Sequence, residues 1–152
     1  MDREIKKIKI CCVVSIDITL KFMLLPQLKF LKSQGYEVHA VCAPGKWIKS
    51  VEQEGIKIET IRFKRKFFSP VSDLIAFVKL FFYFKKEKFD IVHTHTQKPE
   101  FYGQIVAKLA GVPIIMNTFH GLAFGEISSL LERKFFVLLG KIASNYSDVI
   151  FS

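Results

Sequence analysis

Short apolar runs rich in β-branched residues alternate along the chain with longer segments in which apolar residues recur every three or four positions. The short runs predict strands at 8–15, 37–43, 56–63, 90–95, 112–119 and 148–152. The longer segments predict helices at about 20–34, 46–54, 70–88, 100–110 and 126–146. This alternation is typical of βαβ units. We therefore expect an α/β, Rossmann-like, doubly wound domain, with a mostly parallel sheet of about six strands and helices on both faces.

Glycine and proline positions agree with these elements. Gly35, Gly55 and Gly111 each stand where a helix must end before the next strand, a position that a left-handed residue commonly fills. Pro26 lies inside the first predicted helix. We expect Pro26 either to kink that helix or to mark where its regular part begins.

Composition limits the class of protein. The 152 residues are half hydrophobic, which suits a single folded domain over 1–152. Lys and Arg total 23 against 14 acidic residues. The net charge of +9 favours anionic partners such as phosphates, nucleic acid or an acidic membrane face, without choosing among them.

The most apolar segment, 74–84, is interrupted by Lys79 and is much shorter than the roughly 20 residues that cross a bilayer, so we expect no membrane span.

The cysteines give no sign of a disulfide framework. Cys11, Cys12 and Cys42 are odd in number, lack C-x-x-C spacing and lie in apolar runs that predict strands. We interpret them as reduced core thiols of a cytosolic protein.

Ligands bind such a sheet beyond the carboxyl ends of its strands, so the loops after the strands are where function is sought. The loop after the first strand has no G-x-G-x-x-G, and G-x-x-x-x-G-K-[ST] occurs nowhere in the chain. Dinucleotide-binding and P-loop functions therefore lose their main support. A phosphorelay receiver needs an acidic cluster at these strand ends, where only Asp17 is available.

Two histidines in the stretch DIVHTHTQKPE, at 90–100, are candidates for chemistry. Alternation along a strand places His93 and His95 on one face and the two intervening threonines on the other. A zinc site needs a third and usually a fourth ligand. The other histidines, cysteines and aspartates form no cluster with ligand spacing, so we expect no metal.

Three motifs then carry a resemblance: DIVHTHT at 90–96, LAGVP at 109–113 and FHG at 119–121. Their order and spacing resemble the amino-terminal, acceptor-side domain of a family 4 glycosyltransferase of the glycosyltransferase-B fold, from about residue 8 to 152. The resemblance implies transfer of a sugar, with retention of configuration, in surface polysaccharide synthesis. It also implies a UDP-linked nucleotide-sugar donor, a lipid-linked or saccharide acceptor, and no cofactor.

The same resemblance implies roles for residues at two strand ends. His120 corresponds to a histidine that contacts the donor sugar and helps to stabilise an oxocarbenium-like transition state, so His120 is the expected catalytic residue. Gly121 follows it and lets the backbone approach a ligand closely. His95 and Thr96 are expected at the mouth of the cleft, in contact with acceptor or donor. For His120, the alternative is a strand-end histidine that is hydrogen-bonded to a neighbouring carbonyl. For His95 and Thr96, the alternative is ordinary loop structure.

Ser15, Asp17 and Thr19 occupy the first loop, where family members often carry a glycine-rich turn near the donor's phosphates. This sequence has no paired glycines there. A helix N-terminus can still supply backbone donors for substrate binding. The favoured alternative is a polar loop in which Thr19 caps a helix.

The basic stretch RFKRKFF, at 62–68, and the following helix suggest a surface that faces an anionic membrane. Its aromatic members would be Phe67, Phe68, Phe81, Phe82 and Phe84. The alternative is that the phenylalanines are core and the charges a solvated face. A surface of this kind could also bind single-stranded nucleic acid. No RNA-binding signature is present, so we expect no nucleic-acid partner.

In this family the donor nucleotide is held mainly by a second α/β domain, and the sequence stops before one. We expect a truncated gene product or one half of a split enzyme that is inactive alone and needs a partner domain or subunit. Its expected location is cytoplasmic, peripheral on the inner face of the membrane. The alternative function is a non-catalytic anchoring half that recruits a separate catalytic subunit.

Overall fold

The computed structural model describes residues 6–64, 69–120 and 130–151. The strands are β1 (Lys9–Val13), β2 (Glu37–Cys42), β3 (Lys57–Thr60), β4 (Ile91–His95), β5 (Ile114–Thr118) and β6 (Val149–Phe151). The helices are α1 (Asp17–Thr19), the π-helical turn η1 (Leu20–Leu24), α2 (Leu25–Ser33), α3 (Ile48–Glu52), α4 (Pro70–Glu87), α5 (Gln97–Ala110) and α6 (Leu130–Ser144). All six expected strands are present, each shorter than its apolar run.

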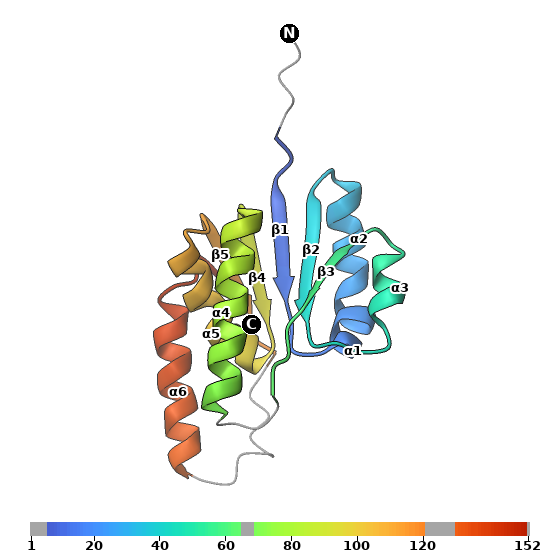
Figure 1. The fold of residues 1–152 in the computed structure, drawn as a ribbon. Coiled ribbons are helices and arrows are strands. Elements are labelled where there is room, and N and C mark those ends of the chain that lie inside the picture. Colours follow the sequence, from blue (N-terminus) through green and yellow to red (C-terminus); the bar gives the residue numbers. More distant parts are fainter. Residues whose placement is uncertain (1–5, 65–68, 121–129, 152) are drawn as a thin grey trace.

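The strands form one sheet in the order β3-β2-β1-β4-β5-β6, and every pair that the structure describes is parallel. The chain runs outward from β1 to β3, crosses back through α4, and continues outward from β4 to β6 (Figure 1). This order confirms the predicted Rossmann-like fold. The direction of winding reverses between β1 and β4, which is where such sheets bind ligands.

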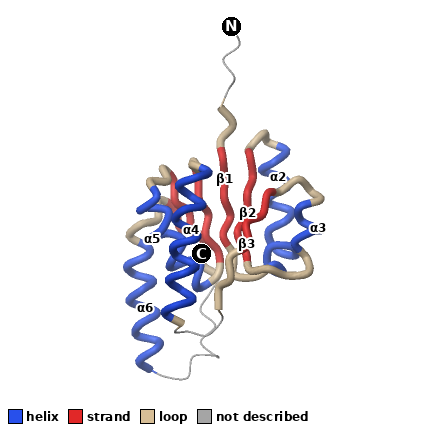
Figure 2. The backbone as a smooth tube through the Cα atoms, viewed as in Figure 1, coloured by secondary structure: helices blue, strands red, loops and turns tan. Residues whose placement is uncertain are grey.

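Helices cover both faces of the sheet, as predicted. On one face, α4 and α5 bury a core that includes Val13, Leu80 and Val106. Figure 2 shows α2 and α3 on the opposite face of the sheet from α4. There η1, α2 and α3 bury a second core that includes Cys12, Leu28 and Val51. Successive residues of β1 therefore alternate between the two cores.

The first helical segment is divided at its proline. It begins at Asp17, earlier than predicted, and its π-helical turn ends at Leu24, just before regular helix begins at Leu25. Pro26 occupies the first turn of that regular helix, where its missing N–H needs no helical acceptor. The second of the two expectations for Pro26 is therefore confirmed.

The phenylalanines of α4 differ in how deeply they are buried. Phe84 is 1% exposed and belongs to the core, so for this residue the alternative of a core phenylalanine holds and the membrane-surface interpretation does not. Phe81 packs partly against the same core, whereas Phe82 is 66% exposed. Phe67 and Phe68, with the basic residues Arg65 and Lys66, lie outside the described residues.

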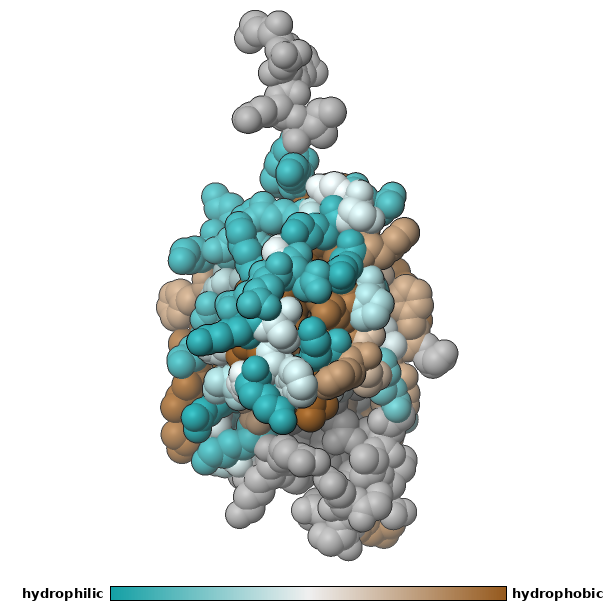
Figure 3. All heavy atoms as spheres, turned by 90° about the vertical axis from the view of Figure 1, so that its right-hand side faces the viewer, coloured by the Kyte–Doolittle hydropathy of each residue, from teal (hydrophilic) through white to brown (hydrophobic). Residues whose placement is uncertain are grey.

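No helix in the described part of the chain has both the length and the apolarity to cross a bilayer. Figure 3 views the side that carries α2 and α3, where hydrophilic side chains predominate. The exposed large apolar residues of α4 are Val71, Leu74, Ile75, Val78 and Phe82.

Candidate functional site

Two hydroxyl side chains meet where the direction of winding reverses, between the carboxyl ends of β1 and β4. Ser15 follows β1 and Thr96 follows β4, and their hydroxyl oxygens lie 2.6 Å apart. The backbone N–H of Ser15 also donates to Thr96 Oγ1 at 3.1 Å. Both residues are half-buried. Two predicted site residues, far apart in sequence, are thus brought together at the carboxyl edge of the sheet.

Thr96 has an uncommon backbone conformation, with φ of 69° and ψ of 156°, immediately before α5. For a residue with a Cβ this conformation costs on the order of 1–3 kcal/mol. The hydrogen bonds to Ser15 help to hold it. Strain held at the ligand-binding edge of a sheet is a feature that functional sites often show.

Asp17 has a structural partner. The backbone N–H of Trp47 donates to Asp17 Oδ2 at 2.9 Å, which ties the loop after β1 to the loop after β2. The carboxylate approaches Gly45 so closely that a Cβ at that position would collide with it. Thr19 lies inside the helical segment that begins at Asp17, so it is not the N-cap that the sequence suggested. Neither side chain is joined to the Ser15–Thr96 pair by a hydrogen bond within the described residues.

His120, the predicted catalytic residue, stands just beyond the carboxyl end of β5 and is exposed. Its Nε2 lies 3.2 Å from Nδ1 of His95, and the two rings stack with centroids 5.5 Å apart. His95, the last residue of β4, is only 2% exposed. The structure therefore joins two of the predicted site residues. Gly121 lies outside the described residues.

His93 continues this row of rings into the sheet. Its ring centroid lies 4.0 Å from that of His95, and its Nε2 is 2.8 Å from Thr118 Oγ1. Burial, followed by the proximity of His120, lowers the pKa of His93 to about 4. Burial, followed by His93 and His120, lowers the pKa of His95 to about 3. Both rings are neutral at physiological pH.

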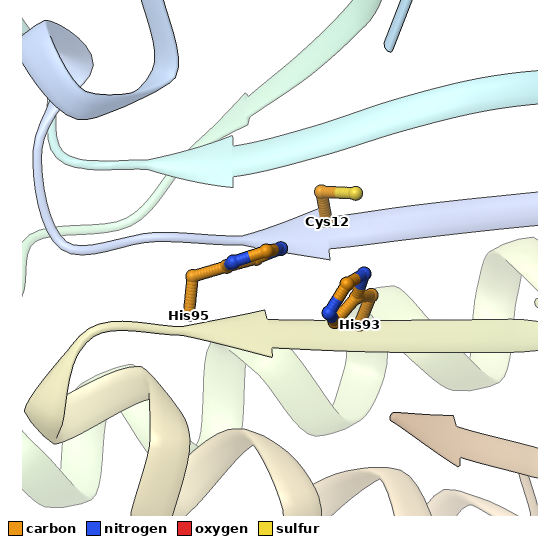
Figure 4. Close-up of side chains that lie close together, drawn as sticks. All are labelled: Cys12, His93 and His95. Atoms are coloured by element: carbon orange, nitrogen blue, oxygen red, sulfur yellow. The ribbon is translucent and has the colours of Figure 1, made fainter. Parts of the chain in front are cut away.

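Cys12 is a neighbour of these histidines that the sequence did not reveal. It lies on β1 in register with His93 on β4, and its side chain faces the same side of the sheet (Figure 4). One donor atom from each of Cys12, His93 and His95 lies within 4.8 Å of the other two. Counting ligands by spacing missed this third donor, because strand register is not readable from sequence spacing. Burial raises the pKa of the Cys12 thiol to about 12.

A pocket of about 490 Å³ opens between the carboxyl ends of β2 and β3 and the first turns of α4. Among the described residues, its cationic lining consists of Arg62, Lys64 and Lys79. The exposed apolar residues Val71 and Ile75 line it as well. A cavity with these walls suits an anion that is joined to an apolar chain.

Solved structures share this fold at low identity. MurG of Acinetobacter baumannii aligns with a TM-score of 0.65 and 18% identity, over 95% of this chain and 40% of that chain. A UDP-N-acetylglucosamine 2-epimerase aligns with a TM-score of 0.68 and 21% identity, over 97% of this chain and 42% of that chain. Anabaena HepE, solved with UDP and glucose, aligns with a TM-score of 0.66 and 18% identity, over 94% and 37%. Likeness at this level shows the fold and does not choose the reaction.

Sequence relatives are more specific. UDP-Gal:alpha-D-GlcNAc-diphosphoundecaprenol alpha-1,3-galactosyltransferase of Escherichia coli is 30% identical over 100 residues, which are 66% of this chain and 26% of that protein. The capsular polysaccharide biosynthesis glycosyltransferase CapM of Staphylococcus aureus is 33% identical over 112 residues, which are 74% of this chain and 28% of that protein. The chain spans about a quarter of the length of these relatives. The pattern described as "Glycosyl transferase 4-like" matches residues 9–152, so the chain belongs to the glycosyl transferase 4-like family.

Proposed function

We propose that residues 1–152 form the acceptor-side half of a retaining glycosyltransferase, which moves a sugar from a UDP-linked donor to an acceptor carried on a lipid diphosphate. The observation that carries this proposal is the pocket beside α4, whose walls combine cations with an apolar surface. Sugar transfer then requires a second, nucleotide-binding domain or subunit, and the 152 residues alone are inactive.

The pocket suits a lipid diphosphate because its two chemical requirements lie side by side. Arg62, Lys64 and Lys79 can neutralise the phosphate charges through charge-assisted hydrogen bonds. Val71 and Ile75 extend onto the apolar outer face of α4, which can take the first part of the lipid chain. A saccharide acceptor without a lipid would leave that apolar face without a role.

The relatives support the choice of substrates. The name of the Escherichia coli relative specifies a UDP-galactose donor and a diphosphoundecaprenol-linked acceptor. The Anabaena structure contains UDP and glucose. These names describe other proteins, and they support a UDP-sugar donor and a lipid-linked acceptor for this one.

His120 is the residue we assign to catalysis. Its exposed ring at the end of β5 is supported from behind by His95, which limits the positions the imidazole can take. We assign it to a hydroxyl of the donor sugar, where an oriented imidazole can stabilise charge that develops in an oxocarbenium-like transition state. Gly121 is assigned to close approach of the same sugar, and the Ser15–Thr96 pair to the adjacent wall of the cleft. We propose that the transfer itself uses no metal ion.

The apolar face of α4 and the nearby cations Arg62 and Lys64 also support a peripheral position on the inner face of an anionic membrane. Each cation near such a surface contributes about 1 kcal/mol of binding. A non-catalytic anchoring half would use the same surface but would give His120 no role. The two functions therefore differ in what a change at His120 does.

The test is a kinetic assay of the transferase reconstituted from this chain and its nucleotide-binding half. Replacing Arg62 or Lys79 by Ala is expected to raise KM for the lipid-diphosphate acceptor by about 10-fold or more, since a hydrogen bond to a charged group is worth about 1.5–3 kcal/mol. KM for the donor should be unchanged. Lys49→Ala is the charge-matched control, because Lys49 is exposed on α3, outside the pocket. An unchanged acceptor KM in both pocket variants would contradict the proposal.

A further inference from the structure

Cys12, His93 and His95 form a compact group of metal-ligating side chains. Their donor atoms all lie within 4.8 Å of one another, and all three residues are at most 5% exposed (Figure 4). They come from adjacent parallel strands, so their relative positions are fixed by backbone hydrogen bonds rather than by a loop. Three atoms no more than 4.8 Å apart all lie within about 2.8 Å of one central point, and metal–nitrogen and metal–sulfur bonds are about 2.0–2.3 Å long, so small side-chain shifts would suffice for all three to bind one ion.

One nitrogen atom of this group lacks a hydrogen-bond partner among the described residues. This atom is Nε2 of His95, which is buried. A buried polar atom without a partner costs about 1–3 kcal/mol, and an ion is one of the ways to satisfy it.

The outer nitrogens of the two histidines are already held in the manner of metal ligands. His95 Nδ1 lies 3.2 Å from His120 Nε2, and His93 Nε2 lies 2.8 Å from Thr118 Oγ1. Hydrogen bonds of this kind fix the orientation of a ligating imidazole and leave its other nitrogen for the metal. Both rings are therefore oriented before an ion arrives.

We propose that Cys12, His93 and His95 bind one Cu(I) ion per chain. A thiolate and imidazoles suit Cu(I) and borderline divalent ions such as Zn²⁺, whereas Mg²⁺ and Ca²⁺ prefer oxygen ligands. The group contains one thiolate and no carboxylate, so Cu(I) gives a neutral site, whereas Zn²⁺ leaves a net positive charge in an apolar core. Zn²⁺ in a closed protein site almost always takes four ligands, and this group offers three among the described residues.

Binding is a simple ligand exchange. The Cys12 thiol releases its proton to solvent as the Cu–S bond forms, and no electron is transferred. The ion can approach from the side of β5, since Met116 and Thr118, on the same face of the sheet as His93, are only half-buried. The site lies apart from the basic pocket beside α4. It shares His95 with the proposed sugar-transfer site, because His95 also contacts His120, but copper binding is measured without any sugar transfer.

The experiment is anaerobic titration of the 152-residue chain with Cu(I) in competition with a chromophoric Cu(I) chelator. The wild type should retain one Cu(I) per chain, and Cys12→Ser and His95→Gln should each weaken binding by more than about 100-fold. Thr118→Val should weaken it by about 10- to 100-fold, the range typical of residues that orient a metal ligand. Cys11→Ser is the matched control, because Cys11 is an equally buried thiol on the opposite face of β1.

X-ray absorption at the copper edge of the wild type gives a readout that does not depend on whether a variant folds. One sulfur and two nitrogen ligands are expected. The proposal is overturned if Cys12→Ser and Cys11→Ser retain copper equally, or if the copper spectrum lacks sulfur. It is also overturned if one Zn²⁺ per chain binds and displaces Cu(I).

Discussion

Nδ1 of the buried His95 lies 3.2 Å from Nε2 of the exposed His120, and their rings stack. This contact joins the interior of the sheet to the carboxyl edge where substrates bind in folds of this kind. Because His95 stays neutral at physiological pH, it holds the outer imidazole without placing a positive charge beside it. The depressed pKa values, the hydroxyl pair and the close Asp17–Gly45 approach each lead to a measurable expectation.

The stability of the domain should fall as pH falls below about 6.5. His93 and His95 have pKa values of about 4 and about 3 in the folded chain, against 6.5 when unperturbed. The unfolded chain therefore binds protons first, and stability is lost progressively as pH falls from about 6.5 toward the folded values. By pH 5 each histidine should contribute a loss of about 2 kcal/mol.

Urea unfolding at pH 7 and pH 5 measures this loss. The wild type should lose up to about 4 kcal/mol from the two histidines together, and His95→Gln should show about half of that difference. A His95→Gln variant with the full wild-type pH dependence would show that this ring is not the titrating group.

Removing the Thr96 hydroxyl should destabilise the domain and abolish the interaction between residue 96 and Ser15. Thr96→Val removes both hydrogen bonds and leaves the Ser15 N–H without its acceptor, for an expected loss of about 1–3 kcal/mol in the free energy of unfolding. In a double-mutant cycle with Ser15→Ala, the coupling energy should be about 1 kcal/mol. Strictly additive effects would indicate that the hydroxyl pair contributes nothing.

A methyl group at Gly45 should collide with the carboxylate of Asp17. Gly45→Ala is expected to destabilise the domain by about 1–3 kcal/mol, because the carboxylate must leave its hydrogen bond to the Trp47 N–H. In an Asp17→Ala background that collision is absent, so the same substitution should cost much less. Denaturation of the two single variants and the double variant tests this, and an equal cost in both backgrounds would place the strain elsewhere.

The pattern of apolar residues was sufficient to predict the sheet and most helices. Alternation predicted that His93 and His95 share one face, and their ring contact confirms it. On α4, residues 76, 80 and 84 repeat every four positions and are buried, so helical period could have identified Phe84 as core.

What escaped prediction depends on strand register and on contacts between loops. Cys12 meets His93 because β1 and β4 pair in one particular register, and no spacing within the chain encodes that pairing. The proximity of Asp17 to Gly45 likewise depends on how two separate loops pack. Residues from distant segments also make the basic pocket, so Lys79 was noticed only as an interruption of an apolar run.

The most direct test of the proposed function is the turnover of a His120→Ala variant in the transferase reconstituted from this chain and its nucleotide-binding half. Loss of a group that stabilises the transition state should lower kcat by about 100-fold or more. The free energy of unfolding of the 152-residue chain should change by no more than about 0.5 kcal/mol, since His120 is exposed. A variant that is equally stable and equally active would contradict the role of His120 at the reacting centre.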